Sequence, residues 1–274
     1  MSDCYCLIIA AGPIDDYCAQ RALLAGLPAP LRVYCADGGL RHAGPLGVTP
    51  DVVVGDFDSA DAELMDSYAK AGARFERHPA NKDFTDTELA AEAALRGGCG
   101  AALILGALGG RLDHTFANIQ MIYKFALRGA RLVLADSCGA AAVLVPGTVL
   151  RVEKRRPAAS LLALEAAADT SATASATASA TSDETSAETS AANADVRARP
   201  DAALSILPIG GPARGLKTYG LKYALDGADV EGCYTTGVSN EFSGGEAGVQ
   251  LAEGAALVMV CADRPPWFAA GRIL

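Results

Sequence analysis

Val52–Ser59 reads VVVGDFDS: three valines, a glycine, a phenylalanine with one aspartate on each side, and a serine. The valines are typical of a short buried strand, and Gly55 allows a sharp turn after it. Asp56 and Asp58 then leave the strand together at its carboxyl end, where open α/β sheets bind ligands. Two like charges this close favour a cation between them, and hard oxygen ligands suit Mg²⁺. This stretch therefore predicts a metal-binding strand end.

Acidic and glycine residues follow three further apolar runs in the same way, after residues 31–36, 73–76 and 101–105. The acidic segment after 73–76 also opens a predicted helix, with Thr85 or Asp86 as its N-cap. Glycine turns that open helices present N–H groups and a positive dipole end to phosphate. The residues expected at these strand ends are Asp37, Gly38, Gly39, Asp56, Asp58, Lys82, Asp83, Asp86, Gly109, Gly110 and Arg111.

This set of residue types points to phosphoryl transfer. The carboxylates can hold Mg²⁺, and Lys82 and Arg111 can balance phosphate charge. The chain lacks the spacing G-x-x-x-x-G-K-[ST], and no Ser or Cys nucleophile has a His partner set up around it. Each cluster alone is explained as a turn, a helix cap or a solvated loop, but the recurrence at successive strand ends favours a site.

Composition limits the partners. The net charge of −9 and a pI near 4.8 argue against nucleic acid, because a basic footprint is missing. Eight cysteines include no C-x-x-C pair, so we expect reduced, buried thiols rather than a zinc or redox motif. The segment Met1–Ala11 lacks a basic n-region and is too short in apolar length to span a bilayer. We expect a soluble, cytoplasmic protein without a membrane partner.

Strands and helices alternate in the first half of the chain, which predicts βαβ units and a mostly parallel sheet over residues 1–146. Beyond residue 146 no helix is expected, and apolar runs separated by glycine turns predict a smaller all-β domain over 147–274, a sandwich or barrel. The expected strands are 4–10, 31–36, 51–54, 73–76, 101–105, 131–135, 149–153, 203–209, 234–238 and 256–261, and the expected helices are 15–25, 60–71, 85–96 and 115–128.

A low-complexity segment at about 165–198 interrupts the second domain. Thr-Ala-Ser repeats fill 170–182, and no residue between Leu164 and Val196 is larger in apolar bulk than alanine. Such a stretch cannot bury enough apolar surface to offset its ordering entropy, so we expect a disordered insertion. A folded accessory hairpin or helix is the alternative.

Six motifs in order resemble the thiamine pyrophosphokinase (thiamine diphosphokinase) family, in its bacterial style. The resemblance covers nearly the whole chain apart from 165–198. The motifs are ADGG at 36–39, GDFDS at 55–59, KDFTDTE at 82–88, GGRLDH at 109–114, GLKYAL at 220–225 and GVSNEF at 237–242.

The resemblance implies a Rossmann-like nucleotide domain followed by a β-sandwich that binds thiamine, in a homodimer whose site lies between the first domain of one subunit and the second of its partner. It implies transfer of a pyrophosphoryl group from ATP to thiamine, giving thiamine diphosphate and AMP. Asp56 and Asp58 would hold Mg²⁺, with Asp37, and Asp83 or Asp86, closing the catalytic acidic cluster. Ser239 and Asn240 would hydrogen-bond the aminopyrimidine of thiamine. The residues implied on the ATP side are Gly38, Gly39, Lys82, Thr85, Gly109, Arg111, Asp113, His114 and Asn118.

Some assignments stay open. The single tryptophan, Trp267, does not match the family's thiamine-stacking position, and Tyr219 and Tyr223 are candidates for that role. The identity of a general base is also open. Competing functions are a pyrophosphokinase for a pterin alcohol, a D-x-D phosphatase and a non-catalytic nucleotide or thiamine sensor.

Overall fold

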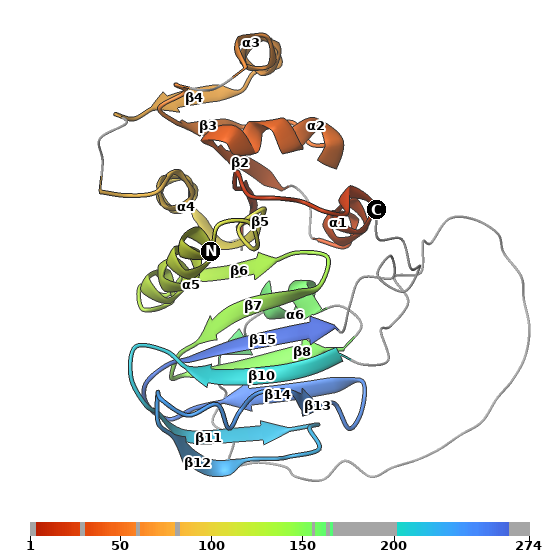
Figure 1. Cartoon of the computed structure of the whole chain (residues 1–274), viewed down its shortest axis with the longest axis vertical. Helices are drawn as coiled ribbons and strands as arrows, with labels where there is room; N and C mark the ends of the chain where they lie inside the picture. Colours follow the sequence, from red (N-terminus) through yellow and green to blue (C-terminus); the bar gives the residue numbers. More distant parts are fainter. Residues whose placement is uncertain are drawn as a thin grey trace, which may run out of the picture.

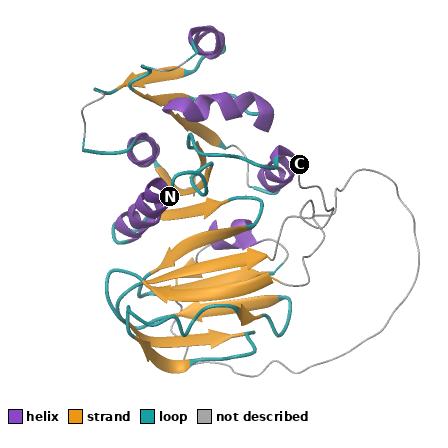
Figure 2. Ribbon diagram, viewed as in Figure 1, coloured by secondary structure: helices purple, strands orange, loops and turns teal. Residues whose placement is uncertain are grey.

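The computed structural model describes residues 4–27, 31–58, 61–79, 83–154, 157–162, 165–166 and 202–262 of the 274. Lys82, Trp267 and almost all of the 165–198 insertion lie outside these ranges. The described residues form two sheets with helices packed against the larger one (Figures 1 and 2).

The larger sheet has ten strands in the order β13-β10-β15-β7-β6-β5-β1-β2-β3-β4. Its parallel part confirms the predicted βαβ units and forms a Rossmann-like arrangement, with a switch in strand order between β1 and β5. The parallel strands are β1 (Cys4–Ile9), β2 (Arg32–Ala36), β3 (Val52–Gly55), β4 (Arg74–Arg77), β5 (Cys99–Leu105) and β6 (Arg131–Ala135). Four antiparallel strands extend it: β7 (Gly139–Leu144), β15 (Ala256–Ala262), β10 (Ala202–Pro208) and β13 (Asn240–Glu241).

The smaller sheet is antiparallel, in the order β12-β11-β14-β8-β9. The chain beyond residue 146 is therefore shared between both sheets, because β15 pairs with β7 of the larger sheet and β10 pairs with β15. Residues 234–238, expected as a strand, form turns instead. The strands of the smaller sheet are β8 (Thr148–Glu153), β9 (Glu165–Ala166), β11 (Ala213–Tyr219), β12 (Asp226–Val230) and β14 (Glu246–Gln250).

The helices in the first half confirm the sequence pattern, with α5 beginning at Leu112 rather than Thr115. Thr85 caps α4, since its hydroxyl accepts a hydrogen bond from the Glu88 N–H at 3.2 Å. The short helix α6 contradicts the expectation of no helix beyond residue 146. The helices are α1 (Tyr17–Ala25), the 3-10 helix η1 (Asp37–His42), α2 (Ala43–Leu46), α3 (Ala62–Lys70), α4 (Asp86–Arg96), α5 (Leu112–Ala126) and α6 (Pro157–Leu162).

Two cores lie on opposite faces of the larger sheet. Alternate residues of each strand face opposite sides, so Ile8 and Ile104 pack under α4 and α5. Leu7 and Leu103 face the other way, into a core that continues to Leu161 of α6 and the smaller sheet. This explains why α6 forms: its apolar side chains fill the space between the two sheets. The described helices are all too short or too polar to cross a lipid bilayer.

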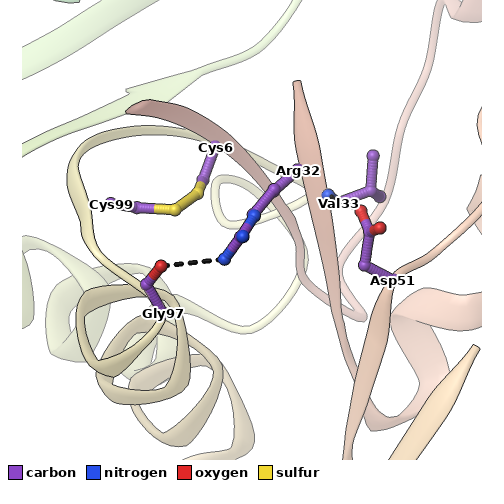
Figure 3. Close-up of a disulfide and its surroundings, with 6 residues drawn as sticks. All are labelled: Cys6, Arg32, Val33, Asp51, Gly97 and Cys99. Carbon is purple, nitrogen blue, oxygen red and sulfur yellow. Dashed lines mark hydrogen bonds between the residues drawn. A yellow bond between two sulfur atoms is a disulfide. The ribbon is translucent and has the colours of Figure 1, made fainter. Parts of the chain in front are cut away.

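A disulfide joins Cys6 of β1 to Cys99 of β5 (Figure 3). The expectation of reduced thiols is therefore wrong for this pair. The neighbouring parallel strands bring the two Cα atoms to 6.1 Å, within the span that a disulfide bridges. Beside the bond, Nη1 of Arg32 donates to the Gly97 carbonyl at 2.8 Å and links β2 to the start of β5 (Figure 3).

Gly39 packs directly on the backbone of β1. A Cβ there would lie 2.1 Å from the carbonyl oxygen of Ile9, so any side chain would push η1 away from the sheet. We expect Gly39→Ala to lower the free energy of unfolding by about 2 kcal/mol, as overpacking does. The matched control is Gly100→Ala in β5, where no atom lies within 4 Å of the added methyl group. Urea denaturation measures both variants, and equal stabilities would contradict this account of the contact.

Candidate active site

Asp37 lies at the end of β2 with its carboxyl pressed against the end of β3. A Cβ on Gly55 would lie 2.8 Å from both Cβ and Oδ1 of Asp37, so the missing side chain of that glycine makes room for the carboxyl. Asp37 has a backbone φ of 41°, a conformation that few non-glycine residues adopt. Its Oδ1 is buried and has no hydrogen-bond partner. The fold therefore holds an acceptor atom ready for a ligand at this edge of the sheet.

The charges around Asp37 make its ionised form costly. Burial raises the pKa of Asp37, and the nearby carboxylates of Asp86 and Asp56 raise it further, although backbone contacts with Gly38 and Phe57 oppose the shift. The carboxylates of Asp56 and Asp86 are therefore near enough to Asp37 for their charges to act on it.

Phe57 anchors the D-x-D turn. Its ring packs edge-on against Phe75 with a centroid separation of 5.6 Å, and the guanidinium of Arg77 lies 5.3 Å from its centroid. Arg77 also donates from Nη1 to the Asp56 carbonyl at 2.8 Å. Phe57 has φ of 58°, and the Asp58 N–H donates to Oδ1 of Asp56 at 3.2 Å. The turn therefore points its aromatic residue inward and leaves the two carboxylates facing outward.

Asp83 and Thr85, which belong to the acidic segment at 82–88, do not contribute to the surroundings of Asp37 in the way that Asp86 does. Asp83 is exposed, and its charge is not among the neighbours that shift Asp37. The hydroxyl of Thr85 is used to cap α4. Among the candidates in this segment, the structure therefore favours Asp86 over Asp83 as the third carboxylate. Lys82 lies outside the described residues.

These residues suit Mg²⁺ shared with a phosphate. Within the described residues, no three His, Cys, Asp or Glu side chains are close enough to hold a metal ion by themselves. Mg²⁺ does not require such a cage, because it commonly takes one or two carboxylates and completes its shell with water and substrate phosphates. The unpartnered Oδ1 of Asp37, in the space left by Gly55, is the acceptor that such an ion needs.

The glycine turn after β5 lies at the same edge. Gly109 and Gly110 both have positive φ, of 74° and 65°. Arg111 is exposed and forms a two-pronged ion pair with Asp113, at 3.1 Å from Nε to Oδ1 and 2.6 Å from Nη2 to Oδ2. The pKa of Asp113 is lowered chiefly by its hydrogen bonds with Arg111. In this arrangement Asp113 occupies the Nε–Nη2 edge of the guanidinium, and the N–H groups of Nη1 are the donors left for a phosphate.

Asn118 and His114, both expected on the nucleotide side, differ in their surroundings. Asn118 is buried and donates from Nδ2 to the Ala107 carbonyl at 2.8 Å, so it supports the glycine turn from beneath. The His114 side chain is exposed at the first turn of α5, and its N–H donates to Asp113 Oδ1 at 2.9 Å. Of the two, the structure leaves only His114 open to a ligand.

The β1–α1 loop, which none of the sequence motifs includes, packs against η1 at this edge of the sheet. His42 is buried, with one ring nitrogen 2.9 Å from the Gly12 carbonyl and the other 2.6 Å from the Tyr17 hydroxyl. Burial lowers its pKa, and the charge of Arg41 adds to the shift. Arg41 donates to the Ala11 carbonyl. η1 therefore holds the β1–α1 loop beside Asp37 through neutral His42.

The predicted thiamine residues lie far along the sheet, around β13. Ser239 is exposed with φ of 61°, and its N–H donates to Oγ of Ser205 at 3.0 Å. Asn240 instead uses its amide on the backbone of Tyr223, accepting at 3.0 Å and donating at 2.7 Å. Asn240 thus orders the turn that carries Tyr223, whose ring is 60% exposed.

Comparison with known proteins matches both parts of the chain to one family. The model of the thiamin pyrophosphokinase catalytic domain matches residues 29–134, and that of the thiamin pyrophosphokinase vitamin B1 binding domain matches residues 195–255. Thiamine pyrophosphokinase of Bacillus subtilis is 34% identical over 146 residues, which cover 51% of this chain and 64% of that protein. Thiamine pyrophosphokinase 1 of rice (Oryza sativa) is 33% identical over 130 residues, covering 39% and 48%. The matched parts thus span about half to two thirds of these relatives.

Solved structures agree on the fold. The crystal structure of the Bacillus subtilis enzyme superposes with a TM-score of 0.69 at 22% identity, covering 95% of this chain and all of that one (100%). Thiamin pyrophosphokinase from Candida albicans superposes with a TM-score of 0.65 at 18% identity, covering 95% and 90%. The site at the ends of β2 and β3 lies within the matched catalytic domain. The chain belongs to the thiamine pyrophosphokinase family.

The charge of Asp37 should lower the stability of the ligand-free protein and yet be needed for turnover. Asp37→Asn removes a charge that is costly in the ligand-free protein, and asparagine tolerates positive φ well. We expect turnover to fall at least ~10²-fold, while the melting temperature without Mg²⁺ and nucleotide at neutral pH rises by about 2 °C. Asp66→Asn, at an exposed position of α3, is the control and should change neither. A lower melting temperature for Asp37→Asn would show that the carboxylate is stabilising and not strained.

Proposed function

We propose that this protein transfers a pyrophosphoryl group from ATP to thiamine in a Mg²⁺-dependent reaction. The carrying observation is the carboxylate trio Asp37, Asp56 and Asp86: the charges of Asp86 and Asp56 raise the pKa of Asp37, whose buried Oδ1 has no hydrogen-bond partner and lies in the space that Gly55 leaves open. Such a cluster is expensive unless a cation and phosphates complete it.

The chemistry follows from positioning and charge. The hydroxyethyl oxygen of thiamine attacks the β-phosphorus of ATP and loses its proton to water, the bond from that phosphorus to the α,β-bridging oxygen breaks, and AMP leaves with the electron pair. Mg²⁺, when bound, supplies charge neutralisation on the phosphates. Asp37 and Asp56 would hold it, and Asp58, at the outer end of the turn, would hold it directly or through water. The N–H groups of the Gly109–Gly110 turn would bind the phosphate chain.

Thiamine is favoured over a pterin alcohol as the acceptor by the match of residues 195–255 to the vitamin B1 binding domain. A non-catalytic sensor is disfavoured by the same carboxylate trio, since recognition alone does not need a costly cluster of like charges.

We propose that the working unit is a homodimer with shared sites. Six strands separate β13, which carries Asn240, from β2, which ends beside Asp37 (Figure 1). β13 and β2 are seven spacings apart, so at about 4.8 Å between neighbouring strands the two half-sites of one chain are about 34 Å apart. One phosphoryl transfer cannot span that distance, so a second copy must bring its thiamine half-site to the carboxylates. Leu112 and Phe116, which are 82% and 60% exposed on one face of α5, give an apolar surface for such a contact.

Asp58→Asn tests the metal assignment and the acceptor together. We expect at least a ~10²-fold loss of AMP production with thiamine, because charge neutralisation is the main catalytic term. The assay follows AMP release from ATP with thiamine and, in parallel, with a pterin alcohol. Near-normal turnover of the variant at saturating Mg²⁺ would remove Asp58 from the metal site, and turnover of only the pterin would overturn the proposed substrate.

Subunit mixing tests the shared site. Asp58→Asn chains are combined with Ser239→Arg chains, in which a long cation would fill the half-site and repel the thiazolium. Each should be nearly inactive alone. If sites are shared between chains, half of the heterodimer's sites combine two unmutated halves, and thiamine turnover returns. Confirmed subunit exchange with no recovery would show that each chain contains its own complete site.

A further inference from the structure

A cavity of about 230 Å³ lies at the switch point between β1 and β5, one strand along from β2, which ends at Asp37. Its walls come from three segments: the β1–α1 loop, the turn after β5 and the turn after β6. Pro13, Ile14 and Leu108 supply apolar surface, while Asp15 and Asp136 supply carboxylates. Open α/β sheets bind ligands at such switch points, and the volume is below the about 300 Å³ that a whole drug-sized ligand needs. The cavity therefore suits one part of a larger molecule.

Gln20 is the feature that gives this cavity a chemical character. It is the one buried residue of α1, with 3% of its surface exposed, and it lines the cavity. Its Oε1 atom is buried and has no hydrogen-bond partner. A buried amide oxygen without a partner destabilises a protein, whereas a ligand that donates a hydrogen bond there would remove the cost.

The walls are held firmly enough to select a ligand. The Gly12 N–H donates to the Gly106 carbonyl at 2.8 Å, which ties the β1–α1 loop to the turn after β5. On the far wall, Oδ1 of Asp136 accepts from the N–H groups of Cys138 and Gly139 at 2.7 and 2.8 Å. Rigid polar groups of this kind discriminate between ligands better than mobile ones.

We propose that this cavity takes the adenine base of ATP and that Gln20 reads its amino edge. A glutamine amide pairs with adenine through two hydrogen bonds, accepting from N6–H₂ and donating to N7. Guanine presents two acceptors, O6 and N7, on the same edge, so it would leave the amide oxygen of Gln20 unpaired. The inference rests on the proposed use of ATP and adds its nucleotide preference.

The rest of the nucleotide fits the surrounding charges. Asp15 and Asp136 repel phosphate but can accept hydrogen bonds from ribose hydroxyls, as acidic residues do in dinucleotide-binding folds. Gly109 and Gly110, which form the turn proposed to bind phosphate, also line the cavity. The strands β5 and β3 are three spacings apart, which is about 14 Å. An extended triphosphate is long enough to cover this distance and reach the carboxylates.

Gln20→Met tests the assignment, because methionine keeps the length of the side chain and removes its hydrogen bonds. AMP binding is measured by calorimetry without thiamine or Mg²⁺, so the readout does not depend on turnover. We expect the Kd for AMP to rise about tenfold, the weak binding of GMP to stay unchanged, and the melting temperature of the ligand-free protein to rise. Gln120→Met, the same change at an exposed position of α5, is the control and should alter none of these.

Photolabelling of the unmutated protein with 8-azido-AMP gives an independent test. We expect the label on peptides that contain residues 13–15 or 135–137, and labelling elsewhere would overturn the assignment. Equal AMP affinity in Gln20→Met and the unmutated protein, or no preference for AMP over GMP, would also overturn it. If AMP binding depends on Gln20 while thiamine is not pyrophosphorylated, the base site stands and the proposed reaction fails. If thiamine is turned over and Gln20→Met leaves the KM for ATP unchanged, the base assignment alone fails.

Discussion

Close contact between the backbones of neighbouring strand ends is the constraint on which the site depends. Gly39 sits on the Ile9 carbonyl, and Gly55 leaves the space that the Asp37 carboxyl fills. Because neither position has a side chain, the ends of β1, β2 and β3 approach closely enough for three aspartates to share one region. Burial of Asp37 at this contact raises its pKa, and repulsion from Asp86 and Asp56 adds to the shift. A larger residue in place of either glycine would push the carboxylates apart and relieve their repulsion. It would also weaken the attraction of the site for a cation.

The site is thus less stable than its surroundings, and its strained features occur together. Asp37 and Phe57 both adopt positive φ, and Oδ1 of Asp37 lacks a partner. Strained backbone and unsatisfied groups persist only where the surrounding packing determines them. Here that packing comes from the Phe57–Phe75 contact with Arg77 over it. The same reasoning applies to Gln20, which lies unpaired in a helix whose other residues are only partly buried or exposed.

The sequence predicted the carboxylates and the parallel sheet because both depend on local signals. Val52–Val54 followed by Gly55 is enough to place Asp56 and Asp58 at a strand end. It did not predict that β10 and β15 join the larger sheet, since antiparallel pairing with β7 depends on contacts far apart in the chain. The resemblance implies Asn118 and Thr85 on the ATP side, yet their side chains hold a turn and a helix end. Gln20 carries no sequence signal at all, because a glutamine in an amphipathic helix is ordinarily solvated.

Sheet topology also keeps the acidic site and the proposed thiamine half-site of one chain apart. The strand order of the larger sheet places the acidic site near one edge and β13 at the other, with the smaller sheet beyond (Figure 1). A chain that folds in this way cannot bring its own two half-sites together without breaking the continuous hydrogen bonding of six intervening strands. Pairing with a second copy would cost far less, because it requires only surface contact, and in the proposed dimer it would bring each acidic edge to a thiamine half-site. The rigidity of the sheet, which is needed to hold like charges together, is therefore also what makes the proposed activity depend on association.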